Sequence, residues 1–394
     1  MGMALEGVRV IDFSQMMMGP WCTQFLGDLG AEVIKIERPG TGDWERGLPA
    51  MGQLLAGDSP FFLAMNRNKK SVTLNLKDPR AKEVVFRLVE TAHLVVENFR
   101  PGVMDRLGLG YDDLRKVNPG IVYVSGSGYG SSGPYVSRPG QDLLIQALSG
   151  IAANTGRRDD PPTPAGTSIV DASTALLMAF AAMVGLFHRF RTGQGQKIEV
   201  SLLNTAIAIQ CQELAAFLNL PKRWERSASG IGGAWLAAPF GIYRTQDGYL
   251  AIAMASLTTL GQLLDLPELA QYDTPELAYE QRDVIKPTIE SRLATNRTTY
   301  WLELLLAHDV WCAEVKSFDE VVTDPQVLHN HLLETIVHPR AGELRVVGNP
   351  IVFSETPAAI RYPPPLVGQH TEEVLRELGY SAEEIVRLRE EGVI

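Results

Sequence analysis

The fold is decided by one stretch of sequence, which begins Val8-Arg9-Val10-Ile11-Asp12-Phe13 and ends Glu32-Val33-Ile34-Lys35-Ile36-Glu37. Both runs are rich in β-branched residues and alternate apolar with polar side chains, as strands do. Between them, the loop Ser14–Pro20 and the segment Thr23–Leu29 predict a turn followed by a helix. The stretch therefore predicts a strand–helix–strand unit.

The same alternation of helix and strand continues through the first third of the chain. Helices are predicted at Pro79–Thr91 and near Tyr111–Val117, and strands at Leu94–Glu97 and Ile121–Ser125. Strands that alternate with helices form a parallel sheet with helices on both faces. We therefore expect a doubly wound α/β domain.

Further helices are predicted at about 141–153 and 172–191, followed by a strand at Lys197–Ser201. The apolar run Ala172–Phe187 is shorter than the roughly 20 residues that a membrane span needs, so we expect a buried helix there. The segment Pro221–Ala238, rich in Gly, Ser, Arg and Trp, is typical of a domain boundary.

A smaller α+β module is expected beyond this boundary. Phe240–Tyr243 and Tyr249–Met254 flank Asp247-Gly248 as the two arms of a hairpin, and two helices follow at 278–293 and 298–308. From about residue 325 onward, two short strands and two helices offer too little material for a core of their own, so they should pack on the first domain. The predicted domains are 1–220 plus 325–394, and 221–324.

The composition excludes several classes of function. The 394 residues carry 46 acidic and 36 basic side chains, a net charge of -10, which disfavours a protein that coats nucleic acid or an anionic membrane. Three widely spaced cysteines indicate neither a disulfide framework nor a zinc site. Charged residues such as Glu6 and Arg9 interrupt the N-terminal segment, so we expect a cytoplasmic protein.

Two familiar nucleotide motifs are also missing. The turn Ser14–Pro20 contains a single glycine, whereas a dinucleotide fold needs several to approach a pyrophosphate. The glycine-rich segment Gly126–Pro134 lacks the Lys-Ser/Thr ending of an ATP-binding loop. The histidines are scattered, and His329 and His331 do not share a helix face, so no metal site is predicted.

Asp171 is the most informative single residue, because it stands at the amino end of an otherwise apolar helix. An aspartate at such a position is commonly a helix N-cap. The helix N-terminus would also hold the carboxylate ionised and oriented, as a carboxylate nucleophile requires. The residue alone leaves both interpretations open.

Several segments together resemble the class III coenzyme A transferases, a family that includes formyl-CoA transferase, carnitine CoA-transferase and α-methylacyl-CoA racemase. The resemblance runs nearly end to end and is specific because the segments keep their order. They are Gly7–Asp12 with Gly19-Pro20, Leu29–Glu37, Asn68–Asn75, Glu97–Gly102, Gly128–Gly130 with Gly133-Pro134, Asp171 and Thr192–Gln196.

The resemblance implies a Rossmann-like large domain built from both chain ends, a smaller inserted α+β domain, and a homodimer of interlocked rings. Asp171 matches the catalytic aspartate of the family. Other positions match residues that hold coenzyme A or lie against its thioester. These are Gln15, Met16, Met17, Arg38, Lys77, Asn98, Phe99 and Arg106.

The implied reaction moves coenzyme A, as a substrate, between carboxylic acids without a metal. It proceeds through a mixed anhydride and then a thioester on Asp171. The racemase branch has a histidine where this chain has Gln141, in Arg138-Pro139-Gly140-Gln141-Asp142. Glutamine does not exchange protons near neutral pH, so the racemase reading is disfavoured.

Three alternatives to transfer remain: a racemase, an acyl-CoA dehydratase or isomerase, and a non-catalytic CoA-binding protein. The sequence does not name the acyl group or the acceptor acid. Four arginines are candidates for pairing with the far carboxylate of a dicarboxylic substrate: Arg67, Arg138, Arg223 and Arg226.

Overall fold

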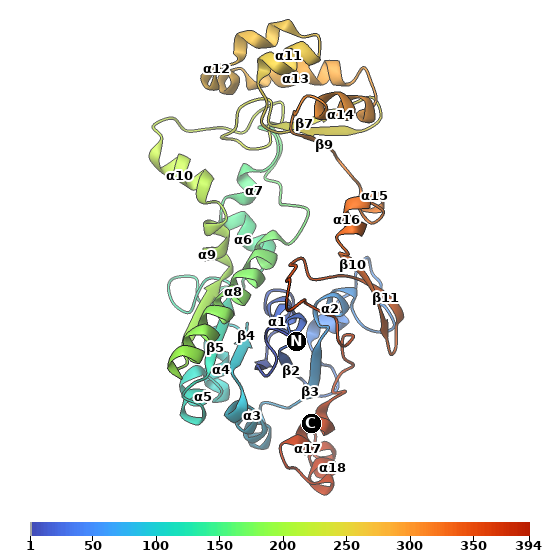
Figure 1. Cartoon of the computed structure of the whole chain (residues 1–394). Coiled ribbons are helices and arrows are strands. Elements are labelled where there is room, and N and C mark those ends of the chain that lie inside the picture. Colours follow the sequence, from blue (N-terminus) through green and yellow to red (C-terminus); the bar gives the residue numbers. More distant parts are fainter. Residues whose placement is uncertain (1) are drawn as a thin grey trace. The chain divides into compact units, whose positions relative to one another are not determined.

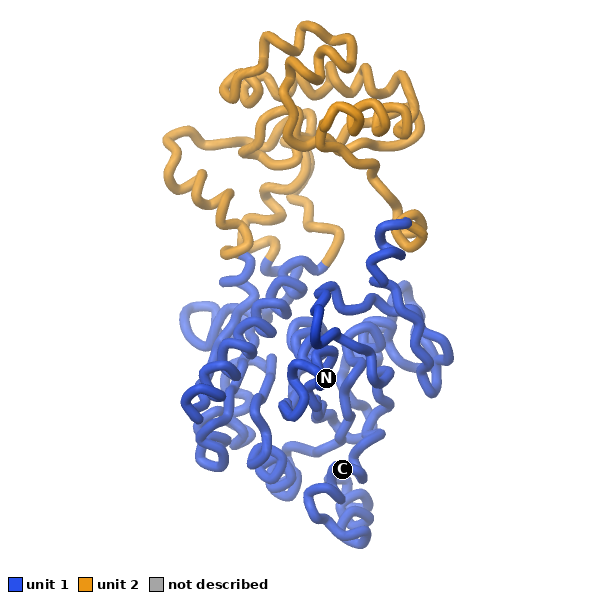
Figure 2. Tube along the Cα trace, in the orientation of Figure 1, with its two compact units in different colours: residues 1–145, 168–206, 325–394 blue, residues 146–167, 207–324 orange. Residues whose placement is uncertain are grey.

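The computed structural model describes residues 2–394, and the chain divides into two compact units (Figure 2). Unit 1 takes the residues up to Ile145, Ser168–Ala206 and Pro325–Ile394, and therefore contains both chain ends. Unit 2 takes Gln146–Thr167 and Ile207–Asp324. Unit 2 thus includes two short segments, 146–167 and 207–220, that the sequence had placed with the large domain.

Unit 1 is built on a six-stranded sheet with the order β3-β2-β1-β4-β5-β6, in which every neighbouring pair is parallel (Figure 1). This order is that of a Rossmann-like doubly wound sheet. The strands are β1 (Arg9–Asp12), β2 (Glu32–Glu37), β3 (Lys69–Thr73), β4 (Leu94–Glu97), β5 (Val122–Ser127) and β6 (Lys197–Ser201). The parallel sheet predicted from the sequence is confirmed, although β3 was not foreseen.

The helices of unit 1 follow the predicted alternation with shifted ends. The first begins at Met18, earlier than expected, because Pro20 fits within the first turn of a helix. The main helices are α1 (Met18–Asp28), α2 (Pro60–Met65), α3 (Pro79–Thr91), α4 (Val103–Leu107), α5 (Tyr111–Val117), α6 (Asp142–Leu148), α8 (Ile169–Thr192), α17 (Thr371–Glu377) and α18 (Ala382–Glu390).

One hydrophobic core joins the sheet of unit 1 to the end of the chain. Ile34 and Val95 of the sheet and Val84 of α3 are fully buried in the same cluster as Val374 of α17 and Ile385 of α18. The strands β10 (Leu333–His338) and β11 (Gly342–Val347) pair antiparallel in the same unit. The expectation that the C-terminal segment packs on the first domain is confirmed.

Helix α8 differs from the buried helix that the sequence predicted. It has 24 residues and is long and apolar enough to cross a membrane, with 39% of its most apolar window buried. Met178, Ala182 and Leu186 lie in the core, whereas Phe180 and Phe187 are 67% and 63% exposed. The helix therefore has one buried face and one exposed apolar face.

Unit 2 contains the predicted hairpin, since β7 (Gly241–Arg244) pairs antiparallel with β8 (Tyr249–Ile252), and β9 (Cys312–Glu314) adds a third strand. Leu250, Ile289 and Trp301 are buried in its core. The helices of this unit are α7 (Ile151–Asn154), α10 (Cys211–Asn219), α11 (Leu257–Leu263), α12 (Pro275–Glu280), α13 (Arg282–Leu293), α14 (Thr298–Leu306) and α15 (Phe318–Val321).

Candidate active site

A cavity of about 410 Å³ lies where the strand order of the sheet reverses, beside the carboxyl ends of β1 and β4. The connections from these two strands leave in opposite directions, which opens a crevice where ligands of doubly wound folds bind. All the residues that line the cavity belong to unit 1. They include Gln15–Met18, Trp44, Asn98–Pro101, Ser127–Gly130, Val136, Arg138–Gln141, Asp171 and Leu202.

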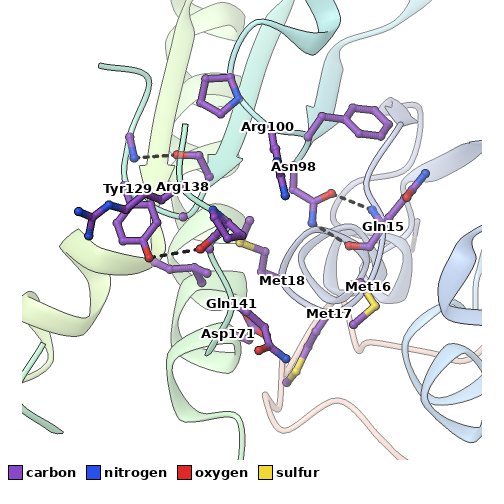
Figure 3. Close-up of a pocket in the computed structure, with 18 of the residues that line it drawn as sticks. Gln15, Met16, Met17, Met18, Asn98, Arg100, Tyr129, Arg138, Gln141 and Asp171 are labelled. Atoms are coloured by element: carbon purple, nitrogen blue, oxygen red, sulfur yellow. Dashed lines mark hydrogen bonds between the residues drawn. The ribbon is translucent and has the colours of Figure 1, made fainter. Parts of the chain in front are cut away.

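Gln15 and Asn98 clamp together the loops that follow β1 and β4. The backbone N–H of Gln15 donates to Oδ1 of Asn98 at 2.8 Å, and Nδ2 of Asn98 donates to the carbonyl of Gln15 at 2.7 Å (Figure 3). The next residue, Met16, has φ of 62°, a conformation that side chains other than glycine rarely adopt. A strained residue held by a double hydrogen bond is characteristic of a preorganised binding loop.

Buried charged side chains hold the loop that follows β1. Lys35 donates from Nζ to the carbonyl of Ser14 at 2.7 Å, and Asp12 accepts the backbone N–H of Ser14 at 2.9 Å. Lys69 pairs with Asp12 at 3.0 Å, and both side chains are fully buried. Burial opposes ionisation of Asp12, but Lys69 and Lys35 together lower its pKa. The loop therefore rests on a fixed ionic support.

The acid at the end of β2 is engaged within the protein. Glu37 accepts two hydrogen bonds from Arg46, each at 2.8 Å, and one from the hydroxyl of Ser71 at 2.6 Å. In dinucleotide-binding folds, the corresponding acid binds a ribose hydroxyl. Glu37 instead fixes the turn η1 (Trp44–Gly47), which places Trp44 at the cavity.

Asp171 is the third residue of α8, and the N-cap position belongs to Ser168, which makes no side-chain capping bond. The N-cap interpretation of Asp171 is therefore wrong. The cap comes from Asp142, whose Oδ2 accepts the backbone N–H groups of Val170 at 2.8 Å and Asp171 at 3.0 Å. The side chain of Asp171 is left to line the cavity.

The surroundings of Asp171 favour its protonated form. Burial raises the pKa of Asp171 to about 7, and the negative charge of Asp142 acts in the same direction. This contradicts the expectation that the helix N-terminus would hold Asp171 ionised. At neutral pH, a substantial part of the Asp171 carboxyl group is ionised and the rest carries a proton.

The structure brings most of the predicted site residues together. Asp171, Gln15, Met16, Met17, Asn98 and Phe99 all line the one cavity. Arg38, Lys77 and Arg106 do not line it; they are exposed and follow the carboxyl ends of β2, β3 and β4, respectively. Arg38 and Lys77 lie in the loops that follow β2 and β3, and Arg106 lies in α4, the helix that follows β4.

Three residues of the site were not assigned a role from sequence. Asp142 was quoted only as part of a motif, and its partner α8 begins 27 residues later. Trp44 and Tyr129 line the cavity; Tyr129 was part of the matched segment Gly128–Gly130 without a role of its own, and no sequence pattern distinguished Trp44. Gln141 lies beside Asp171 (Figure 3), where the racemase branch would need an ionisable group. Among residues 2–394, no cluster of three or more His, Cys, Asp or Glu side chains is arranged to hold a metal ion.

The sequence matches the model of CoA-transferase family III over residues 5–371. Succinyl-CoA:glutarate CoA-transferase from Mus musculus is 38% identical over 99% of this chain and 90% of its own length. Formyl-CoA:oxalate CoA-transferase from Streptomyces avermitilis is 35% identical over 99% of both chains.

Solved structures agree with this similarity. A CAIB/BAIF family protein from Brucella suis has a TM-score of 0.82 at 30% identity, covering 96% of this chain and all of that chain. Rv3272 from Mycobacterium tuberculosis has a TM-score of 0.83 at 32% identity, covering 95% and 99%. The chain belongs to CoA-transferase family III.

Proposed function

We propose that this protein is an acyl-CoA:carboxylate CoA-transferase and that Asp171 carries the acyl group and then coenzyme A. The observation that supports it best is the position of Asp171, a single carboxyl group facing a cavity at the topological switch point of the sheet. A cavity of about 410 Å³ suits an acyl group and the end of the pantetheine arm.

The transfer consists of paired substitutions at carbonyl carbons. The carboxylate of Asp171 attacks the donor thioester, so that the C–S bond breaks and a mixed anhydride and CoA thiolate form. The thiolate then attacks the aspartyl carbonyl, which releases the donor acid and leaves an aspartyl-CoA thioester. The acceptor carboxylate attacks this thioester, which forms a second mixed anhydride and releases the CoA thiolate. The thiolate then attacks the acceptor's carbonyl in this anhydride, which forms the new acyl-CoA and restores the carboxylate of Asp171.

Each step exchanges one activated carboxyl for another, so the protein needs chiefly to orient the groups and exclude water. The Gln15–Asn98 clamp and the buried ions behind it serve orientation. The apolar side chains of Met17, Met18 and Trp44 serve to exclude water from the anhydride.

The position of Gln141 beside Asp171 favours transfer over racemisation. Racemisation at an α-carbon needs a second group that exchanges protons near neutral pH, and an amide does not. Glutamine can instead donate a hydrogen bond to a carbonyl oxygen that gains charge during acyl transfer.

We also propose that the protein is a homodimer, in which the exposed face of α8 lies against the partner. Phe180, Phe187 and Phe190 are each more than 60% exposed on this helix, with Leu176 and Val184 nearby in the same face. A contiguous apolar patch of this kind marks an interaction surface. The interlocked arrangement of the two chains is the form that the family resemblance favours.

The activity is tested by incubating the protein with one acyl-CoA and a mixture of carboxylic acids, and then identifying all thioesters by mass spectrometry. We expect new acyl-CoAs that depend on the added acids and disappear in the Asp171→Ala variant. Loss of α-stereochemistry, or of water, without an acceptor would indicate the racemase or the dehydratase instead. Binding of CoA without any conversion would indicate a non-catalytic protein.

A further inference from the structure

Two glycines of the candidate active site touch each other, and neither position has room for a side chain. Gly128 follows β5 directly, Gly140 stands two residues before α6, and both line the cavity that contains Asp171. A Cβ atom on Gly128 would lie 2.7 Å from the Cα atom of Gly140, and a Cβ atom on Gly140 would lie 2.4 Å from the Cα atom of Gly128. The two backbones are therefore in direct contact.

The backbone dihedral angles do not explain why these two positions are glycine. Gly130 and Gly133, which lie between them in the chain, have φ of 99° and 93°, a region that other residues rarely adopt. Gly128 and Gly140 lie outside this region. What these two positions require is the absence of a side chain.

The sheet of unit 1 holds Gly128 in place. The preceding residue, Ser127, pairs with Ser201 of β6. The carbonyl of Gly128 accepts the backbone N–H of Leu203, in α9 (Leu202–Ala208), at 3.0 Å. One side of the contact between the glycines is thus fixed to the end of the sheet.

A short path joins the other side of the contact to Asp171. Gly140 is followed by Gln141, which lies beside Asp171 (Figure 3), and then by Asp142. Oδ2 of Asp142 accepts the backbone N–H groups of Val170 at 2.8 Å and Asp171 at 3.0 Å. A displacement of Gly140 would therefore move Gln141 and Asp142 relative to Asp171.

The segment between the two glycines, residues 129–139, has contacts of its own. The ring centroids of Tyr129 and Tyr135 lie 5.7 Å apart, and the Cζ atom of Arg138 lies 3.8 Å from the centroid of the Tyr135 ring. The hydroxyl of Tyr129 donates to the carbonyl of Pro139 at 3.3 Å. The contact between the glycines and the aromatic contacts within the segment can therefore be altered separately.

We propose that Gly128 and Gly140 are positioning residues of the proposed CoA transfer, because their contact fixes Gln141 and Asp142 against Asp171. The proposal rests on the proposed function and adds to it two residues that act through the backbone. Neither glycine supplies a reacting group. Together they allow the end of β5 and the start of α6 to meet closely enough to set the position of the nucleophile's neighbours.

The ionisation of Asp171 reports where Asp142 lies. Burial and the negative charge of Asp142 raise the pKa of Asp171 to about 7. Two other charged side chains, Arg100 and Arg138, line the same cavity, and Asp171 in turn acts on the buried acid Glu45, whose pKa is raised by burial to about 8. A displacement that takes Asp142 away from Asp171 should lower the pKa of Asp171.

The first experiment measures single-turnover acylation by one acyl-CoA over a range of pH in the wild type, Gly128→Ala and Gly140→Ala. Each alanine has to open the contact by about 1 Å, and a displacement of that size costs roughly 10- to 100-fold in rate. We expect the maximum rate to fall by that factor. The pH of half-maximal rate should fall by up to about one unit, because the charge of Asp142 moves away.

A Cβ atom that only narrows the cavity would act differently. It would raise the acyl-CoA concentration needed for half-maximal acylation, and it would leave the maximum rate and its pH dependence unchanged. That outcome in both glycine variants would overturn the inference.

Two further variants separate the contact from its surroundings. Gly166→Ala is the matched control, because no atom beyond the chain neighbours lies within 4 Å of a Cβ atom there, and it should leave the maximum rate and its pH dependence unchanged. Tyr135→Ala removes the aromatic contacts of residues 129–139 and keeps both glycines, so the pH of half-maximal rate should stay in place. A shift in Tyr135→Ala of about one unit would assign the positioning to this segment instead, even if the glycine variants do not fold.

Titration of Asp171 without substrate tests the inference independently of turnover. The carboxyl carbon of Asp171 can be followed by NMR in protein labelled at its aspartates, and Asp171→Asn identifies its signal. We expect the titration midpoint to fall in Gly140→Ala and to stay unchanged in Gly166→Ala. An unchanged midpoint in Gly140→Ala would overturn the inference even if CoA transfer is established. Failure of all acyl-CoAs to react would instead overturn the proposed function, and the midpoints would still decide on the role of the glycines.

Discussion

Asp142 accepts the backbone N–H of Asp171 at 3.0 Å, so one carboxylate caps the helix whose first turn carries the other. The same residue thus orients the candidate nucleophile and, through its charge, raises the pKa of that nucleophile. A nucleophile with a pKa near 7 is more basic than an ordinary aspartate while remaining partly ionised at neutral pH.

The first prediction concerns the pH dependence of acylation. The reactive form of Asp171 is the ionised form, and its pKa is raised to about 7. The rate should therefore rise by about tenfold per pH unit below this value and level off above it. Single-turnover measurements of adduct formation with one acyl-CoA would show this rise of the rate with pH, which we call the acid limb. A rate that is already constant at pH 5 would contradict the raised pKa.

The second prediction concerns Asp142→Asn. Asparagine keeps an oxygen that accepts the N–H groups of Val170 and Asp171, but it removes the negative charge. The acid limb should move to lower pH, by about one unit or less, since a neighbouring like charge is one of two causes of the shift. Asp142→Ala, which also removes the cap, should in addition lower stability by about 1 kcal/mol. An unmoved limb in Asp142→Asn would show that its charge does not act on Asp171.

The third prediction concerns the clamp between the loops after β1 and β4. Asn98→Ala removes both hydrogen bonds to Gln15, which should lower the free energy of unfolding by about 1–3 kcal/mol and reduce kcat/KM as the loop loses its position. Asn98→Asp keeps the acceptor for the N–H of Gln15 and loses the donor to its carbonyl, so it should have an intermediate effect. Chemical denaturation and initial rates measure the two effects. Full activity in Asn98→Ala would show that the clamp is dispensable.

The fourth prediction concerns the buried ionic support. Lys69→Met leaves the fully buried carboxylate of Asp12 without its ion-pair partner, and removing one member of such a pair costs about 3–5 kcal/mol. The double variant Asp12→Asn with Lys69→Met should be more stable than the single Lys69→Met variant, because no buried charge is then uncompensated. Urea denaturation of the three proteins tests this order. Equal stabilities of the wild type and Lys69→Met would contradict it.

The fifth prediction concerns assembly. Phe180→Ser and Phe187→Ser replace exposed apolar side chains of α8 and should shift the protein from dimer toward monomer in sedimentation velocity experiments. Val386→Ser, on the exposed side of α18, is the matched control and should leave the dimer intact. A wild-type protein that sediments as a monomer at all concentrations would refute the proposed dimer.

Much of the sheet could be predicted from the sequence because its strands are buried and β-branched, as in Val10-Ile11 and Val33-Ile34. Strand β3 was missed because Lys69, Lys70 and Ser71 look polar. Lys69 is buried beside Asp12, 57 residues earlier in the chain, which neutralises its charge. A partner so distant in the chain leaves no local pattern.

The candidate site could be predicted to a similar extent. The features that could not be predicted also depend on residues that are distant in the chain. The family resemblance located Asp171 and the two loops, whose residues the structure places around one cavity. The protonation of Asp171 was misjudged because it depends on burial and on Asp142, 29 residues earlier in the chain. Which arginine lines the cavity likewise depends on packing: of the four arginines named from the sequence, only Arg138 lines it.

The central claim is that Asp171 becomes covalently acylated, and mass spectrometry of the digested protein tests it most directly. The protein is exposed briefly to succinyl-CoA, treated with hydroxylamine and digested. We predict a hydroxamate on the peptide that contains Asp171, and none in the Asp171→Ala variant. Continued CoA exchange in that variant, or a hydroxamate at another residue in the wild type, would contradict the account.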